Sequence, residues 1–174
     1  MPTVQTRYRY LVVDEDGLGT DLRRGLAVLL AAILDDGERY RGRAWRTLRP
    51  TFRVVALDAQ GEAIGQASGS WVPTRPPIRL LGLGDVAVAP AHRRRNVART
   101  VCGLAVNEAW RLHAVAILLK TKPLRTVFAD LGFEAATDGP FFHVENGARI
   151  VHPDWMAASA SALPASIELE EGDF

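Results

Sequence analysis

The segment from Arg79 to Arg99 constrains the fold of this chain more than any other. Its first half, Arg79–Ala89, is a mostly apolar run that is typical of a strand. A short loop with three consecutive arginines, 93 to 95, follows the run, and Val97 then begins a helical pattern. This order places the unpaired N–H groups of a helix N-terminus beside a strand end, where an anion is favoured.

The residues around this helix start favour a phosphate-bearing ligand. Cations are unfavourable at the positive end of a helix unless an anion completes the site. Asn96 stands where the backbone must turn sharply, and asparagine tolerates the left-handed conformation. Gly82 and Gly84 in the preceding strand would let a ligand with amide bonds approach and pair with the strand edge. Coenzyme A, with a pyrophosphate and a pantetheine arm, fits both features; the alternative is a solvated arginine run before an ordinary helix.

The rest of the chain predicts one domain of the α+β (mixed α/β) class. Apolar residues from Leu22 to Leu34 recur on one helix face, and a second helix is predicted over Val97–His113. A third helix is expected from Pro123 to Leu131. The predicted strands are Tyr8–Val13, Arg53–Asp58, Ala63–Val72, Arg79–Ala89, Val115–Leu119, Phe141–Val144 and Arg149–His152. Residues 1–157 are expected to form the domain and residues 158–174 an acidic tail.

Two stretches resemble the GNAT superfamily of N-acetyltransferases. The first runs from Asp85 to Arg99 and is similar to that superfamily's acetyl-CoA motif, Arg/Gln-x-x-Gly-x-Gly/Ala after a Val-x-Pro turn. The second, Leu118–Phe133, resembles its later strand–helix signature ending in Leu-Gly-Phe. The two cover about residues 80 to 135 in the expected order, and the resemblance implies a mostly antiparallel central sheet flanked by helices.

The resemblance also implies which residues bind the cosubstrate, acetyl-CoA or another acyl-CoA. Backbone groups of Val86 and Val88 would meet the acetyl and pantetheine part, and the arginine loop with the helix start would wrap the pyrophosphate. The expected coenzyme-binding positions are Val86, Val88, Arg93, Arg94, Arg95, Asn96, Val97, Ala98, Arg99, Thr121 and Phe128. Asn96 replaces the usual glycine, and Phe128 replaces the frequent tyrosine that protonates the leaving thiolate.

Two residues are candidates for catalysis. Asp85 is the leading candidate for the general base, with a structural carboxylate at a strand end as the alternative. Because neighbouring strand residues point to opposite faces, a bulge permitted by Gly84 would be needed to aim it. His143, on a late strand, is the second candidate, with a structural histidine as the alternative.

Composition excludes several other classes of function. The formal net charge of +1 argues against a dedicated nucleic-acid binder, and the single cysteine, Cys102, excludes an internal disulfide and a cysteine zinc site. No metal is expected. No apolar run approaches the roughly 20 residues that span a membrane, so a cytoplasmic protein is expected. The oligomeric state stays open, with a homodimer as one alternative.

The acceptor is expected to be a small-molecule amine. The stretch from Trp45 to Gly61 resembles a segment of nodulation acyltransferases. The final residues, 172–174, resemble the end of aminoglycoside 2′-N-acetyltransferases, whose terminal carboxylate approaches the substrate. An amino sugar, an aminoglycoside and a natural-product amine are therefore the candidate acceptors. Two alternatives to an acetyltransferase are a transferase for a longer acyl-CoA and a catalytically degenerate acyl-CoA-binding protein.

Overall fold

The computed structural model describes residues 8–34, 37–40, 43–45 and 47–170. The helical elements are η1 (Glu15–Gly17), α1 (Thr20–Ile33), η2 (Gly37–Tyr40), η3 (Pro90–His92), α2 (Val97–Arg111) and α3 (Arg125–Ala129). The strands are β1 (Arg9–Asp14), β2 (Phe52–Leu57), β3 (Ala63–Trp71), β4 (Thr74–Arg75), β5 (Leu80–Val88), β6 (Ala116–Lys120), β7 (Glu134–Ala135), β8 (Phe141–Glu145), β9 (Ala148–Ile150), β10 (Trp155–Ser159) and β11 (Ile167–Leu169).

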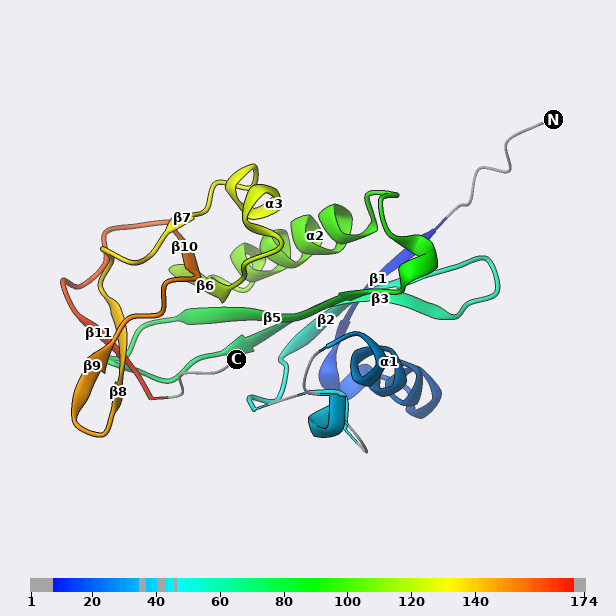
Figure 1. The fold of residues 1–174 in the computed structure, drawn as a ribbon, viewed down its shortest axis with the longest axis horizontal. Helices are drawn as coiled ribbons and strands as arrows, with labels where there is room; N and C mark the ends of the chain where they lie inside the picture. The colour runs from blue at the N-terminus through cyan, green and yellow to red at the C-terminus, as the bar shows by residue number, and fades with distance from the viewer. Residues whose placement is uncertain (1–7, 35–36, 41–42, 46, 171–174) are drawn as a thin grey trace.

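A seven-stranded sheet with the order β1-β2-β3-β5-β6-β10-β7 runs through the molecule. Its neighbouring strands are antiparallel except for β5 and β6, which are parallel and are joined by the crossover helix α2. Figure 1 shows α2 and α3 above this sheet and α1 below it. The α+β class and the mostly antiparallel sheet predicted from the sequence are thus confirmed.

The two faces of the sheet belong to different hydrophobic clusters. Alternating side chains such as Val54, Ala56 and Leu81 pack with α2, whereas Val55 and Leu57 pack with α1. This alternation follows from the period of two along a strand and fixes the register of β2. The sheet is therefore buried on both faces over its central strands.

A second, four-stranded sheet with the order β4-β11-β8-β9 packs beside the first. Its strand β11 lies between β4 and β8, and Ile167 and Leu169 of β11 are buried against Trp155 of the main sheet. Residues 158 to 170, which were expected to belong to an acidic tail, thus include the end of β10 and all of β11.

The boundaries predicted for the longer elements differ from the structure by a few residues at most. Helix α1, whose predicted apolar face ran from Leu22 to Leu34, spans Thr20–Ile33. The third helix, expected from Pro123 to Leu131, is shorter and spans only Arg125–Ala129. Four short strands were not predicted: β4, β7, β10 and β11. No helix in the described part of the chain has the length and apolarity needed to cross a membrane.

Candidate active site

The parallel strands β5 and β6 separate near the middle of the sheet. Their ladder runs from the Leu80–Ala116 pair to the Leu83–Leu119 pair and ends there, whereas β5 continues to Val88. Beyond Leu83, β5 stays paired with β3 on its other side. The edge of β5 that faces away from β3 can therefore accept hydrogen bonds from, and donate them to, a ligand that lies between the two strands.

The loop after β5 has two residues in the left-handed backbone conformation. Arg94 and Asn96 both have positive φ, 57° and 62°, and Asn96 is the N-cap residue of α2. Asparagine adopts this left-handed conformation more readily than most residues, as the sequence predicted. Arg93 donates a hydrogen bond from Nε to the carbonyl oxygen of Val88 (3.1 Å), which ties the loop to the strand end.

A cavity of about 220 Å³ opens at the start of α2. Its lining includes seven of the predicted coenzyme-binding positions: Val88, Arg93, Arg94, Asn96, Val97, Ala98 and Arg99. Two further lining residues, His92 and Val127, were not predicted. His92 is held in place because the hydroxyl of Tyr8 lies 3.1 Å from its Nδ1.

Four predicted coenzyme positions lie outside this lining: Val86 on β5, Arg95 in the loop before α2, Thr121 after β6 and Phe128 in α3. Thr121 follows β6, and its Oγ1 accepts a hydrogen bond from the backbone N–H of Leu124 (3.2 Å). Phe128 is only 1% exposed and packs edge-to-face on Phe133, so Val127 lines the cavity in its place. Phe128, predicted to replace a tyrosine, is thus a buried ring without an ionisable group.

Asp85 lies in a bulge of β5. Between the pairs Gln66–Ala87 and Ser68–Gly84, β3 has one residue and β5 has two, Asp85 and Val86. The sequence predicted a bulge permitted by Gly84; in the structure it is Asp85 itself that has positive φ, 50°. The bulge changes the alternation of side chains along β5 at the point where the strand leaves β6.

The carboxylate of Asp85 points towards the α1 side of the sheet. Its Oδ1 accepts a hydrogen bond from the hydroxyl of Tyr40 (2.5 Å), a buried residue of η2 that packs in the α1 cluster. Its Oδ2 lies 3.4 Å from Oγ of Ser68. Asp85 is half-buried, so the carboxylate is held by hydrogen bonds yet not sealed from a ligand.

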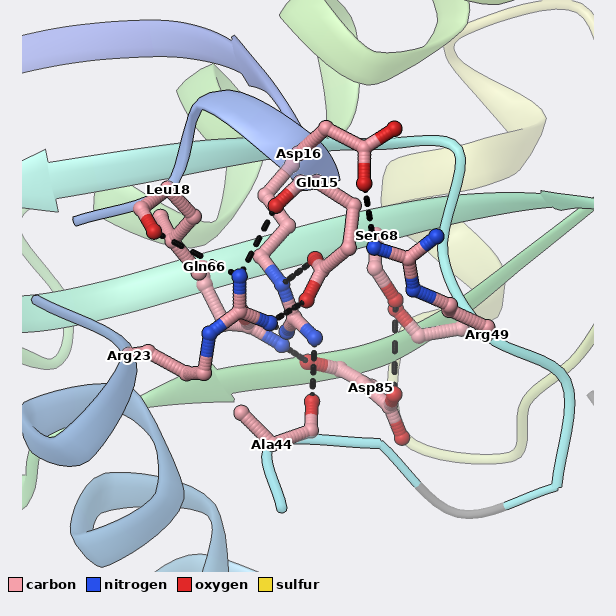
Figure 2. Close-up of polar contacts among 11 residues, drawn as sticks. Glu15, Asp16, Leu18, Arg23, Ala44, Arg49, Gln66, Ser68 and Asp85 are labelled. Carbon is pink, nitrogen blue, oxygen red and sulfur yellow. Dashed lines mark hydrogen bonds and ion pairs between the residues drawn. The ribbon is translucent and has the colours of Figure 1, made fainter. Parts of the chain in front are cut away.

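Arg53 and Glu15 form a buried ion pair that was not predicted from the sequence. Gln66 connects this pair to the backbone of Asp85. Arg53 is fully buried, and its Nε donates to Oε2 of Glu15 (2.6 Å). Its Nη1 donates to Oε1 of Gln66 (2.8 Å). Figure 2 shows Glu15, Gln66 and Asp85, which come from different parts of the chain, lying beside one another. A pattern of residue types along β2 and β3 could not have predicted this pairing, because its partners lie far apart in the chain.

A second cavity, of about 660 Å³, lies between α1 and the segment that follows it. Small apolar side chains on one face of α1, Ala27, Val28 and Ala31, form much of its lining, with Arg23 at one end. Tyr40 also lines it, and the same Tyr40 hydroxyl donates to Asp85. Tyr40 therefore connects this cavity to Asp85, the candidate base.

His143, the second catalytic candidate, lies in the other sheet. It is part of β8, packs edge-to-face against Trp155 (5.8 Å between ring centroids), and its Nε2 lies 4.0 Å from the Glu145 carboxylate. Asp85 thus lies on β5, the strand that leads into the loop predicted to bind the coenzyme, whereas His143 lies in the other sheet.

The mostly antiparallel sheet, in which the parallel strands β5 and β6 separate and are joined by α2, is the fold of an acyl-CoA N-acyltransferase. In agreement with this class, the model of the Acetyltransferase (GNAT) family matches residues 24–133. The match spans more than half of the chain, so the chain belongs to the acetyltransferase (GNAT) family.

Similar proteins support the family and the fold. N-acetyltransferase Eis of Mycobacterium tuberculosis is 43% identical over 67 residues, which cover 34% of this chain and 17% of the relative. The chain thus spans only a small part of that relative's length. The GNAT family N-acetyltransferase YhbS from Escherichia coli, solved in complex with CoA, is 16% identical and has a TM-score of 0.72, covering 98% of this chain and 92% of the other. A GNAT family acetyltransferase from Brucella melitensis, solved with acetyl-CoA, has a TM-score of 0.66 at 14% identity, with coverage of 91% and 93%.

Proposed function

We propose that this protein transfers an acetyl group from acetyl-CoA to a primary amine of a small molecule. The observation that carries the proposal is the position of Asp85 on β5, between the coenzyme loop and the cavity beside α1. The two cavities would hold the two substrates. Asp85 lies on β5, whose last residue, Val88, lines the first cavity, and Tyr40, which lines the second, donates a hydrogen bond to its carboxylate. Crystallised relatives with CoA and acetyl-CoA support an acyl-CoA as donor.

The residues present fit acetyl-CoA in three places. The first N–H groups of α2 and the side chains of the arginine loop suit the pyrophosphate. The open edge of β5 around Val86 and Val88 suits the amide groups of the pantetheine arm. A backbone N–H near Val88 would stabilise the oxyanion that forms when the thioester carbonyl is attacked.

The reaction would proceed by direct attack. Asp85 takes one proton from the acceptor ammonium, and the free amine nitrogen attacks the thioester carbon. The C–N bond forms and the C–S bond breaks. The second proton lost by nitrogen goes to the departing thiolate, which leaves as coenzyme A. Because Phe128 has no ionisable group, the leaving thiolate receives its proton from the reacting amine or from water.

The acceptor would enter the cavity beside α1. Candidates are an amino sugar, an aminoglycoside and a natural-product amine. The apolar face of α1 in this cavity, together with the guanidinium of Arg23, suits an amine with an apolar body better than a polycation. Amines with one positive charge should therefore be screened first, with an aminoglycoside as the contrasting probe.

Calorimetric titration with acetyl-CoA tests the donor site. Hydrogen bonds to charged groups contribute about 1.5–3 kcal/mol each, so changing both Arg94 and Arg95 to alanine should weaken binding by at least about tenfold. Changing Arg149, an exposed arginine of β9, to alanine is the matched control and should leave binding unaltered.

Thiol release measured across the amine panel tests the transfer itself. Turnover of an amine with acetyl-CoA would support an acetyltransferase. A preference for longer acyl-CoAs would support the alternative, a transferase for a longer acyl group. Binding of acetyl-CoA without turnover of any amine would favour the catalytically degenerate alternative, and no binding of any acyl-CoA would refute the proposal.

A further inference from the structure

The strained bulge at Asp85 is held by a side chain from the neighbouring strand. Gln66 of β3 donates a hydrogen bond from Nε2 to the backbone carbonyl oxygen of Asp85 (2.9 Å). In a regular antiparallel ladder that carbonyl would face a backbone N–H of β3, but the extra residue of the bulge disrupts the ladder there. The amide of Gln66 therefore satisfies a carbonyl that the bulge has displaced.

Gln66 is itself fixed, because it is fully buried and its Oε1 accepts from Nη1 of Arg53 (2.8 Å). The guanidinium of Arg53 cannot turn to another partner. Its Nε donates to Glu15 (2.6 Å), and its Nη2 donates to the carbonyl oxygen of Ala44. Since arginine has donors only, the oxygen of Gln66 must face Arg53 and its N–H₂ group must face Asp85.

The chain of contacts continues to the cavity beside α1. Glu15 is almost fully buried and accepts from both Arg53 and Arg23, and Arg23 lines that cavity. Figure 2 shows Gln66, Asp85 and Glu15 in this arrangement. A buried network whose donors and acceptors are all matched is rigid, and it can hold a strained backbone conformation that would otherwise relax.

We infer that Gln66 is a positioning residue for the proposed reaction: oriented by the Arg53–Glu15 pair, it holds the bulge that aims the Asp85 carboxylate at Tyr40 and the acceptor cavity. This inference rests on the proposed role of Asp85 as the base. Gln66 touches neither substrate in this arrangement and acts only through the backbone of Asp85.

Two variants of Gln66 test the inference. Gln66→Glu keeps an oxygen for Arg53 but replaces the N–H donor by a second oxygen facing the Asp85 carbonyl. Gln66→Leu removes both groups. Ser70→Ala, a buried polar residue on the same face of β3, is the control. Amide hydrogen exchange at residues 84–87 should be faster in both Gln66 variants and unaltered in the control, while thermal unfolding verifies that each variant is folded.

Turnover of two amines of different basicity separates positioning from general damage. An alkylamine such as 2-phenylethylamine has a pKa of about 10 and needs a base at pH 7, whereas phenylhydrazine is largely neutral there. Both Gln66 variants should lower kcat for 2-phenylethylamine by about 10- to 100-fold, with little effect on phenylhydrazine or on acetyl-CoA binding. Adding Gln66→Leu to Asp85→Asn should cause no further loss, because both changes remove the same step.

The outcomes distinguish this inference from the proposed function. Full turnover of 2-phenylethylamine by Asp85→Asn at neutral pH would overturn the base assignment. A loss in Asp85→Asn without a loss in either Gln66 variant would overturn only the inference. Unaltered hydrogen exchange at residues 84–87 in the folded Gln66 variants would overturn the inference whatever the turnover.

Discussion

The single thiol of this protein, Cys102, is fully buried in helix α2, and burial raises its pKa from 9.0 to about 12. The folded state therefore holds this proton more tightly than the unfolded state. The stabilising contribution is complete below about pH 9 and is lost as pH rises towards 12. The free energy of unfolding of the wild type should fall more steeply between pH 9 and 11 than that of Cys102→Ala.

Urea denaturation at pH 8, 9.5 and 10.5 measures this difference. The same burial predicts that Cys102 stays unreactive towards iodoacetamide at pH 8 until the protein unfolds. Rapid alkylation of the folded protein would contradict the buried position of the thiol. So would a free energy of unfolding that depends on pH equally in the wild type and in Cys102→Ala.

Two residues with positive φ illustrate how far the sequence predicts a site. The left-handed conformation of Asn96 could be predicted, because it follows from a helix start and a sharp turn within a few residues of chain. The bulge at Asp85 could also be proposed from the sequence, but the direction in which it points the carboxylate could not. Its direction depends on Gln66 and Tyr40, which are 19 and 45 residues away in the chain.

The strands of the main sheet approach one another closely where glycine leaves room. A Cβ on Gly69 of β3 would lie 2.4 Å from the ring of Phe52 and 3.0 Å from Leu81, both fully buried. Gly69→Ala should therefore lower the free energy of unfolding by about 1–3 kcal/mol. Gly25→Ala in α1, where nothing lies within 4 Å of the added Cβ, should raise it by about 0.5–1 kcal/mol.

Urea denaturation measures the free energy of unfolding of both variants. Because the change of residue is the same in each, the comparison separates the cost of overpacking at Gly69 from the gain in backbone entropy at Gly25. A Gly69→Ala protein as stable as the wild type would show that Phe52 can move aside. In that case β2 and β3 would be less tightly packed than the structure indicates.

Element length explains why the longest elements were predicted and the two shortest strands were not. Helices α1 and α2 and strands β2, β3 and β5 have enough residues to show a period, and their boundaries were predicted closely. Strands β4 and β7 have two residues each and show no period at all. Strand β11 was missed because Ile167 and Leu169 stand among acidic residues, and only the second sheet gives them a buried face.

At the scale of the whole molecule, the second sheet depends on its last strand. Because β11 separates β4 from β8, ending the chain at Ser161 removes pairing partners from both. The burial of Ile167 and Leu169 is also lost, at about 1.5–3 kcal/mol for each side chain. The truncated chain should therefore unfold at a markedly lower urea concentration than the full chain.

A chain ending at Glu170 is the control for this truncation. It keeps β11 and removes residues 171–174, which lie outside the described residues. We expect its stability to match that of the full chain. If the chain ending at Ser161 were as stable as the full chain, the structural role of β11 would be contradicted.

The parallel pairing of β5 with β6 has a consequence for the order of events during folding. These strands meet only after the intervening chain, including all of α2, has been brought together, and such non-local pairing forms slowly. The proposed donor site is built from the same three elements, so it is incomplete until they are assembled. Acetyl-CoA should then slow the unfolding rate, measured by stopped-flow fluorescence, and leave the refolding rate unchanged.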